Sequence, residues 1–352
     1  MRTIKNTPIF LIIVVICLFL PSGLHADLTN SQPSQKTIIE DMAGRQAAVP
    51  VEVKRVVTLG SVPAINTFIF AVGKGYAIAN GLPAFARSPY WKYQTIFAPG
   101  IKGRSSIQGS GGPVNVEVLS LLSPDVVFTT SRSDIDYLSK HGPTTIYLDW
   151  KRFDPMYLMR MMGKVFNRQK IAEEYAAGME NRIEMIASAI KGIPQAQRQK
   201  VIFCRLPSLA IPSGPAGWAI TRAGGITMEN SLLKSSDHLV QVSVEQLVLW
   251  NPDILIVWSK EEVAQAYKDA RLSLLNAVKQ KRVYAVPVGA APWLAPTPEQ
   301  YLGVLWAAKL FYPKQFDGID LVTEAKDFYR KFFGYSLTNK QAVEMISGGS
   351  DR

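Results

Sequence analysis

The chain has 352 residues, of which 47% are hydrophobic, so it is long enough for two globular domains of ordinary size. Its formal net charge is +11, which suits an anionic ligand or an anionic surface. The basic residues are scattered, without a Lys/Arg block or a stripe that alternates with aromatic residues, and this argues against nucleic acid as a partner.

Residues 1–26 have the pattern of a cleavable secretory signal peptide. Arg2 and Lys5 precede an apolar run over residues 9–20, and Ala26 is a suitable last residue before a cleavage site. The apolar run is too short to span a bilayer comfortably. We therefore expect an exported protein.

The first part of the remaining chain predicts alternating strands and helices around one long irregular stretch. In chain order we expect a hairpin over 37–51, a strand over 55–59, a helix over 64–72, strands over 76–79 and 125–129, the end of a helix near 137–141, and a strand over 145–148. Residues 80–113 show little periodicity, and a long irregular loop inside a compact domain is usually functional.

Residues 167–193 predict one long helix, because they have helical apolar spacing and no internal proline. Gly178 inside this range weakens the prediction slightly. After it we expect a strand over 200–205, a break over 207–217, a helix over 218–223, a strand over 282–286, a helix from its cap at Thr297 to Phe311, and a terminal packing helix over 327–333.

Two segments of the chain, 114–128 and 242–256, have nearly the same pattern. Each has a small polar cap, a short helix with a glutamate in its first turn, a Pro-Asp break and a buried strand. Such a recurrence indicates internal duplication. The sequence therefore predicts an α/β protein with parallel sheets, made of two Rossmann-like lobes over 27–166 and 194–352 that the helix over 167–193 connects.

Candidate ligand-binding residues follow the predicted strands, since ligands of open parallel sheets bind beyond the carboxyl ends of the strands. Arginine and tryptophan are frequent among them; the first forms paired contacts to anions, and the second supplies flat apolar walls. The candidates are Ser61, Tyr90, Trp91, Arg104, Gly111 and Arg132 from the first lobe, and Arg205, Trp218, Arg222, Lys260 and Trp293 from the second.

Signatures of an enzyme or of a metal site are missing from the sequence. It has no nucleophile elbow, no P-loop and no dinucleotide-binding glycine pattern after a strand. His141 and His238, the two histidines beyond the signal peptide, have no histidine or cysteine partner at metal-ligand spacing. Tyr90 and Tyr93 remain as ligands for a haem iron on residue type alone. We expect no catalytic activity, no resident cofactor and no metal bound by the protein alone.

Several short motifs in the same order carry a resemblance to a known family. They are Asp41-Met42-Ala43-Gly44-Arg45 before Val49-Pro50, then Arg55-Val56-Val57 with Gly60, the two Glu-to-Pro-Asp segments, the stretch from Trp293 to Pro313, and Phe328-Tyr329 with Gly334-Tyr335. With these motifs the chain resembles, over nearly its whole mature length, the periplasmic substrate-binding proteins of ABC importers for ferric siderophores, haem and cobalamin.

The resemblance implies a monomer that holds its ligand, an iron chelate, between two lobes and delivers it to a permease and its ATPase in the inner membrane. It also implies that Glu117 and Glu245 form salt bridges to arginines of the permease. A simpler interpretation of both glutamates is their favourable position near helix N-termini. Some relatives of this family bind molybdate or tungstate, so an oxyanion is the alternative ligand, and a secreted α/β enzyme is a more distant alternative.

Overall fold

The computed structural model describes residues 35–108, 113–139, 142–212, 214–228 and 239–349, which belong to one compact unit. The predicted signal peptide, Gly111, His141 and His238 lie outside the described residues. Of the helices in the described part, not one combines the length and the apolar character that crossing a membrane requires.

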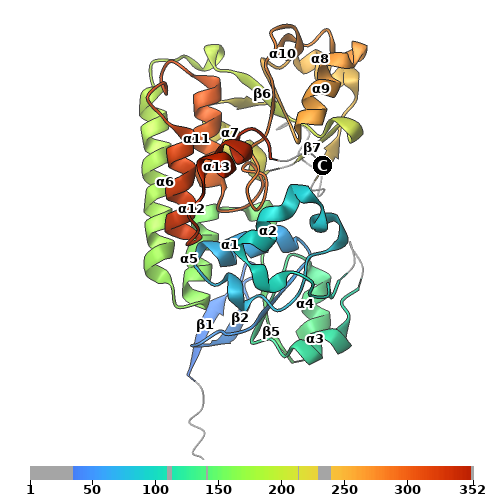
Figure 1. Ribbon diagram of the computed structural model, residues 1–352, viewed down its shortest axis with the longest axis vertical. Helices are drawn as coiled ribbons and strands as arrows, with labels where there is room; N and C mark the ends of the chain where they lie inside the picture. The colour runs from blue at the N-terminus through green and yellow to red at the C-terminus, as the bar shows by residue number, and fades with distance from the viewer. Residues whose placement is uncertain (1–34, 109–112, 140–141, 213, 229–238, 350–352) are drawn as a thin grey trace, which may run out of the picture. The chain divides into compact units, whose positions relative to one another are not determined.

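The first half of this unit contains an antiparallel hairpin and a parallel sheet (Figure 1). Strands β1 (Lys36–Glu40) and β2 (Gln46–Pro50) form the predicted hairpin, with Gly44 in the turn at a positive φ of 78°. The sheet has the order β3-β4-β5 and comprises β3 (Val56–Leu59), β4 (Val126–Thr129) and β5 (Thr144–Tyr147). Its helices are α1 (Val62–Ala71), α2 (Lys92–Phe97), α3 (Val116–Leu122) and α4 (Arg132–Ser139).

The second half repeats this design with a four-stranded parallel sheet. Its order is β11-β10-β6-β8, from β6 (Lys200–Phe203), β8 (Ile226–Thr227), β10 (Ile254–Val257) and β11 (Val283–Ala285). A separate antiparallel pair joins β7 (Ala210–Pro212) to β9 (Leu239–Gln241). The helices are α7 (Pro215–Arg222), α8 (Val244–Trp250), α9 (Lys260–Lys268), α10 (Asn276–Lys279), α11 (Gln300–Phe311), α12 (Leu321–Phe332) and α13 (Asn339–Ile346). The predicted α/β fold with two lobes and parallel sheets is confirmed, whereas the lobe limits stay a prediction.

The duplicated segment folds in the same way in both halves. The Asn115 side chain caps α3 by accepting a hydrogen bond from the Val118 N–H, and Ser243 caps α8 in the same manner. Each helix then ends on a residue in the left-handed region, Ser123 at φ 42° and Asn251 at φ 43°, directly before the Pro-Asp pair.

The aspartate of each Pro-Asp pair fastens the start of the neighbouring parallel strand. The carboxylate of Asp125 accepts hydrogen bonds from the N–H groups of Lys54 and Arg55 at 2.7 and 2.8 Å. The carboxylate of Asp253 accepts one from the Lys200 N–H at 2.9 Å. The Pro-Asp break is therefore a structural device that positions two strands in each sheet.

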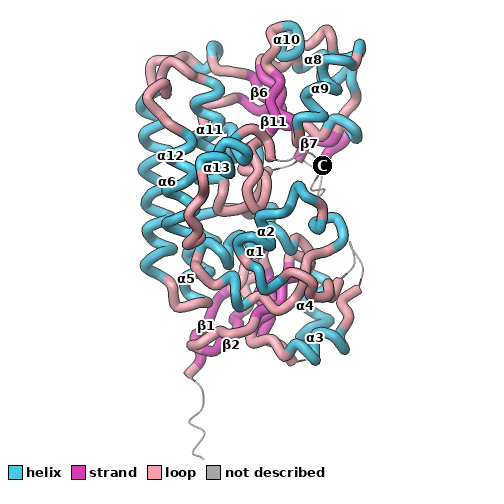
Figure 2. Tube along the Cα trace, in the orientation of Figure 1, coloured by secondary structure: helices cyan, strands magenta, loops and turns pink. Residues whose placement is uncertain are grey.

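Two helices connect the sheets, where the sequence predicted one. The long helix α6 (Gln169–Ala189) has 21 residues, within the predicted range. It is preceded by α5 (Pro155–Val165), whose start has a recognisable signal, an Asp154 cap followed by a proline. At Gly178 of α6, a Cβ atom would lie 2.9 Å from the Tyr301 hydroxyl, so the glycine allows α11 to pack closely against α6 (Figure 2).

The structure corrects several predicted elements. Residues 76–79 do not form a strand; they contain a 3-10 turn and a single bridge between Val56 and Ile78. The predicted irregular stretch 80–113 is not irregular over its described residues 80–108, because these contain α2 and three 3-10 turns. Helix α11 starts at Gln300 and not after Thr297, and α13, which has a capping box, was missed.

Candidate ligand-binding site

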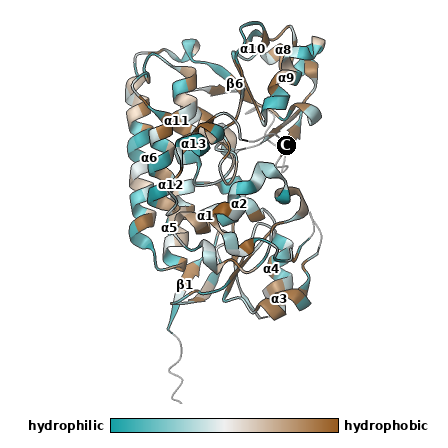
Figure 3. Cartoon of the chain, in the orientation of Figure 1, coloured by the Kyte–Doolittle hydropathy of each residue, from teal (hydrophilic) through white to brown (hydrophobic). Residues whose placement is uncertain are grey.

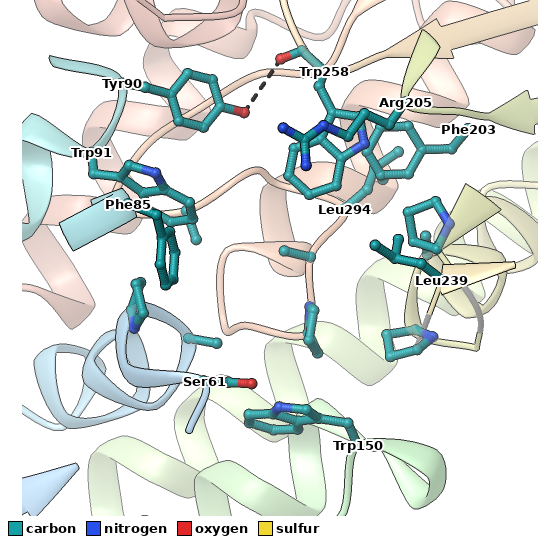
Figure 4. Close-up of a pocket in the computed structure, with 18 of the residues that line it drawn as sticks. Ser61, Phe85, Tyr90, Trp91, Trp150, Phe203, Arg205, Leu239, Trp258 and Leu294 are labelled. Carbon is teal, nitrogen blue, oxygen red and sulfur yellow. Dashed lines mark hydrogen bonds between the residues drawn. The ribbon is translucent and has the colours of Figure 1, made fainter. Parts of the chain in front are cut away.

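A cavity of about 600 Å³ lies where the parallel strands of both sheets end. Its volume is in the range of sites for small organic molecules. Some of its lining residues follow β3, β5, β6, β10 and β11 in the sequence, so both halves contribute (Figure 4). The cavity is lined by Ser61, Pro63, Ala64, Phe85, Ser88, Tyr90, Trp91, Trp150, Phe203, Arg205, Pro212, Pro215, Ala216, Leu239, Trp258, Ala291, Leu294, Ala295 and Pro296.

Ser61 reaches the cavity because the chain turns sharply after β3. Gly60 has a positive φ of 72°, and a Cβ atom there would lie 2.3 Å from the Thr130 hydroxyl. That hydroxyl accepts a hydrogen bond from the Ser61 N–H at 3.2 Å. Ser61 precedes α1, but its side chain does not cap the helix. Its hydroxyl is therefore available at the cavity wall.

Aromatic rings form much of the cavity wall. From the first half, Trp91 packs edge-on against Phe85 and Tyr90, with ring centroids 6.0 and 5.5 Å apart. From the second half, Trp258 stacks on Phe203 at 5.5 Å and an interplanar angle of 18°. Rings that neighbouring rings hold in place offer flat and rigid apolar surfaces to a ligand.

Arg205 is the one charged residue among the described residues that line the cavity. It follows β6, and its side chain projects toward the cavity in Figure 4, near Trp258. A guanidinium group forms charge-assisted, paired hydrogen bonds to carboxylate, catecholate or oxyanion groups. The described lining of the cavity thus combines apolar aromatic walls with one positive group.

A buried carboxylate holds the loop that closes one side of the cavity. Glu299 accepts hydrogen bonds from the N–H groups of Ala290 and Ala291, both at 2.8 Å, and from the Tyr329 hydroxyl. Burial raises the pKa of Glu299 to about 7, against the opposing effect of these three donors. A side chain at Gly289 would collide with both Tyr329 and Glu299, so this loop depends on its glycine.

Glu262 has a similar role beside the opposite wall. Its carboxylate, which is 3% exposed as a residue, accepts hydrogen bonds from the Leu206 N–H at 3.1 Å and the Trp258 N–H at 3.2 Å. These two donors belong to the segments that follow β6 and β10. Glu262 therefore fixes the backbone on which Arg205 and Trp258 are carried.

The segment from Tyr90 to Gln94 bridges the two halves. The Tyr90 hydroxyl donates to the carbonyl of Trp258 at 3.3 Å, which Figure 4 shows as a dashed line. The Gln94 amide donates to the carbonyl of Ala290 at 2.8 Å. Lys92 forms an ion pair with Glu344 of α13. The predicted irregular stretch is therefore a well-bonded contact between the halves beside the cavity.

Of the predicted ligand-binding residues, Ser61, Tyr90, Trp91 and Arg205 line the cavity. Their contact with a ligand stays a prediction. Like most of the other lining residues, they belong either to a segment that follows a strand or to the segment that bridges the two halves.

The other described candidates lie elsewhere. Trp293 is fully buried and donates to the Tyr329 hydroxyl at 3.2 Å. Arg104 and Lys260 line two smaller pockets. The remaining ones make cation–π contacts, Arg132 with Tyr147, and Arg222 with Trp218.

A tyrosine considered for haem iron also lies away from the cavity. Tyr93 is 2% exposed and does not line the cavity, and burial raises the pKa of its hydroxyl. A group of three or more histidine, cysteine, aspartate or glutamate side chains at metal-binding distance is not found in the part of the chain that the structure describes.

Sequence reasoning missed several lining residues, although some have a signal. Trp258 follows β10 immediately, and Trp150 follows β5 by three residues. Both satisfy the rule that selected the original candidates. Phe85, Leu239 and Leu294 have no such signal, because their place depends on how the chain returns to the cavity.

Comparison with known proteins establishes the family. A model of the periplasmic binding protein family matches residues 108–288, slightly more than half of the chain. The chain belongs to this family. It is therefore a solute-binding component of the ABC-importer type, and its relatives place such a protein in the periplasm or outside the cell.

Several relatives of this periplasmic binding protein are characterised by name or structure. The molybdate-binding protein MolA of Haemophilus influenzae is 24% identical over 335 residues, which cover 87% of this chain and 93% of MolA. The structure of MolA with molybdate superimposes with a TM-score of 0.75 at 23% identity, covering 86% of this chain and 99% of MolA. CeuE of Helicobacter pylori, in a nickel–histidine complex, has a TM-score of 0.70 at 19% identity and covers 89% and 99% of the two chains.

A further relative is a substrate-binding lipoprotein of an ABC transporter, YvrC of Bacillus subtilis. It is 23% identical over 278 residues, which cover 75% of this chain and 84% of YvrC. The relatives share the fold of the binding protein, while the ligands named for MolA and CeuE differ. The ligand must therefore be argued from the cavity of this chain.

The two predicted docking residues lie outside the cavity. Glu117 and Glu245 are exposed and occupy the first turns of α3 and α8. The pKa of Glu245 is lowered, first by a hydrogen bond from its own backbone N–H, then by one from Ser243 and by the charge of Arg271. Each half of the binding protein thus presents a carboxylate at the same place of its repeat.

Proposed function

We propose that this protein captures an iron chelate, a ferric siderophore or a haem-like molecule, and delivers it to the permease of an ABC importer. The observation that carries the proposal is a cavity of about 600 Å³ with aromatic walls, in which Arg205 is the one charged residue of the described lining. Flat rings suit the organic part of a chelate, and the guanidinium suits its negative charge. The resemblance of the sequence to siderophore and haem receptors points in the same direction.

Molybdate is the alternative ligand, because MolA binds it and shares the fold. A bare oxyanion has no apolar surface and needs several hydrogen-bond donors around it. The described lining offers Arg205, the Ser61 hydroxyl and few other donors among its aromatic and proline side chains. The cavity therefore favours a large and partly apolar anion over a small polar one.

A fluorescence titration of the purified protein tests this proposal. Ferric siderophores, haem, cobalamin and molybdate are added in turn, and the quenching of Trp91, Trp150 and Trp258 at the cavity reports binding. We expect a saturable signal with an iron chelate. The variant Arg205→Gln should weaken that binding at least tenfold, since it loses a charge-assisted pair.

The matched control is Arg222→Gln, because Arg222 contacts Trp218 and does not line the cavity. It should leave the affinity unchanged. Saturable binding of molybdate alone would replace the proposed ligand with the alternative. Turnover of any of these compounds by the protein would contradict the proposed absence of catalysis.

We also propose that Glu117 and Glu245 are the docking residues for the permease, and that the protein acts as an exported monomer. The two carboxylates are exposed at equivalent positions of the two halves, as a contact to a two-fold symmetric partner requires. The variant Glu117→Arg/Glu245→Arg should abolish uptake and leave ligand affinity nearly unchanged. A loss of ligand affinity would show that these residues act on the cavity instead.

A further inference from the structure

The two most exposed large hydrophobic side chains that the structure describes occupy equivalent positions of the duplicated segment. Leu121 of α3 is 81% exposed, and Leu249 of α8 is 77% exposed. Each follows the glutamate of its own repeat by four residues, so leucine and glutamate are neighbours on one helical face. The same acidic and apolar pair is thus presented twice by the molecule.

These leucines have no packing role within their own lobes. Each short helix is attached to its core by another leucine, Leu119 in α3 and Leu247 in α8, which are 2% and 0% exposed. Both helices are also capped at their first turn, as described above. The fold therefore does not depend on an apolar side chain at the outer position.

The surroundings of α3 and α8 differ, although both helices present the same exposed pair of a glutamate and a leucine. Helix α8 contacts the 3-10 turn at Ala270–Leu272, and the first half has no repeat of that turn among its described elements. Figure 1 shows α3 and α8 on the side of the unit opposite α6, and α3 is among the more hydrophobic helices in Figure 3. One exposed leucine is ordinary on a protein surface, but a matched pair at one register is not explained by chance exposure.

We propose that Leu121 and Leu249 are paired apolar contacts to the permease, each entering an apolar recess beside the basic group that receives the neighbouring glutamate. This inference rests on the proposed docking function and extends it from two charges to two mixed patches. Burial of the leucines supplies affinity that salt does not screen, and the carboxylates supply orientation.

The pattern favours a two-fold partner over other occupants of this surface. An anionic lipid surface would repel the adjacent carboxylates Glu117 and Glu245. A contact with a second copy of the chain needs one self-complementary patch and does not require a repeated one. A permease with two equivalent subunits presents the same recess twice, which matches the duplication.

The test measures binding of the ligand-loaded full chain to its permease–ATPase complex in nanodiscs. The variants are Leu121→Ser, Leu249→Ser and the double variant. We expect each single variant to weaken binding about tenfold and the double variant about a hundredfold, from the loss of buried leucine area. At high salt the effect of Glu117→Arg/Glu245→Arg should shrink, while the effect of the double leucine variant should persist.

The matched control is Ile38→Ser, an exposed aliphatic residue of β1 that is 57% exposed and lies outside the repeat. It should bind the transporter as the wild type does. All variants should retain the unfolding midpoint and the affinity for the iron chelate. A double leucine variant that docks normally while the glutamate variant fails to dock would overturn the inference and leave the docking proposal standing.

Two other outcomes would also overturn the inference. If neither the leucine nor the glutamate variants change binding to the transporter, the docking proposal itself fails and the inference fails with it. The second outcome would come from sedimentation of the free protein. If the wild type forms a dimer that Leu121→Ser dissociates, the patch is a contact between two copies and not a permease site.

Discussion

The two halves of the binding protein share a duplicated segment, yet they build different walls of the cavity. The wall of the first half comes mostly from the helical turns that contain Phe85, Tyr90 and Trp91, which have no counterpart in the repeat. The wall of the second half includes Arg205 and Trp258, which follow β6 and β10 directly. The duplicated parts form the scaffold and the outer surface, and the parts that differ form the cavity.

The halves also differ in how they hold their walls. The first half uses amides: Asn66 donates to Gln94 at 3.1 Å, and Asn80 accepts from the Thr58 N–H at 2.9 Å. The second half uses the buried carboxylates Glu262 and Glu299. Amides do not titrate, whereas burial raises the pKa of Glu299, so a dependence of wall stability on pH is expected at Glu299. Three experiments test how the two halves differ.

The largest effect is expected at Glu299. Its pKa is raised from 4.5 to about 7 in the folded protein, so the native state binds its proton more tightly than the unfolded chain does. The resulting stabilisation is complete below pH 4.5, decreases as the pH rises and is lost above about 7. It amounts to about 3 kcal/mol. Urea unfolding at pH 5 and pH 7.5 measures it.

Glu299→Gln should remove this part of the pH dependence, whatever constant change in stability the substitution causes. The wild type, measured at both pH values in low and in high salt, is the reference for this variant. Equal pH profiles for the wild type and Glu299→Gln would show that the second half does not hold its wall by a titrating group.

The next largest effect is expected on the free energy of unfolding when the two aspartates of the repeat are replaced. Asp125→Ala should lower the free energy of unfolding by about 2 kcal/mol and Asp253→Ala by about 1 kcal/mol, because the first accepts two backbone hydrogen bonds and the second accepts one. Urea denaturation of both variants measures the difference. Equal losses would mean that the number of fastened N–H groups does not decide the contribution of the Pro-Asp pair.

The smallest effect is expected on ligand affinity, when one residue from each wall of the cavity is replaced. Trp91→Ala should weaken binding of the iron chelate about fivefold at every salt concentration, since it removes a ring contact of about 1 kcal/mol. The loss caused by Arg205→Gln should decrease as salt is added. Fluorescence titrations in low and high salt separate the two. Tyr157→Ala, at an exposed aromatic residue of α5, is the control for Trp91.

Local features of the chain could be predicted from sequence. The duplicated helix and strand, the hairpin at Gly44 and the connector α6 all appear where the sequence predicted them. Each depends on interactions between residues that are close in the chain, such as caps, turns and apolar periodicity. The errors at α5 and α13 were avoidable, because the caps Asp154 and Thr338 are visible in the sequence.

The cavity was predictable only in part. Being near the end of a strand selected Ser61 and Arg205, but the same rule also selected Trp293, which is fully buried against Tyr329. Whether a tryptophan lines a cavity or fills the core depends on the direction of its side chain and on which distant element packs against it. Sequence spacing carries no information on that packing.

The sequence by itself determined the repeated unit, the class of fold and the positions of the two exposed glutamates, since these follow from short-range pattern. Only the tertiary structure decided which residues meet at the cavity and that Leu121 and Leu249 are exposed. The physical reason is that an apolar side chain at helical spacing is buried or exposed according to the neighbours that cover it. Those neighbours are contributed by segments far away in the chain.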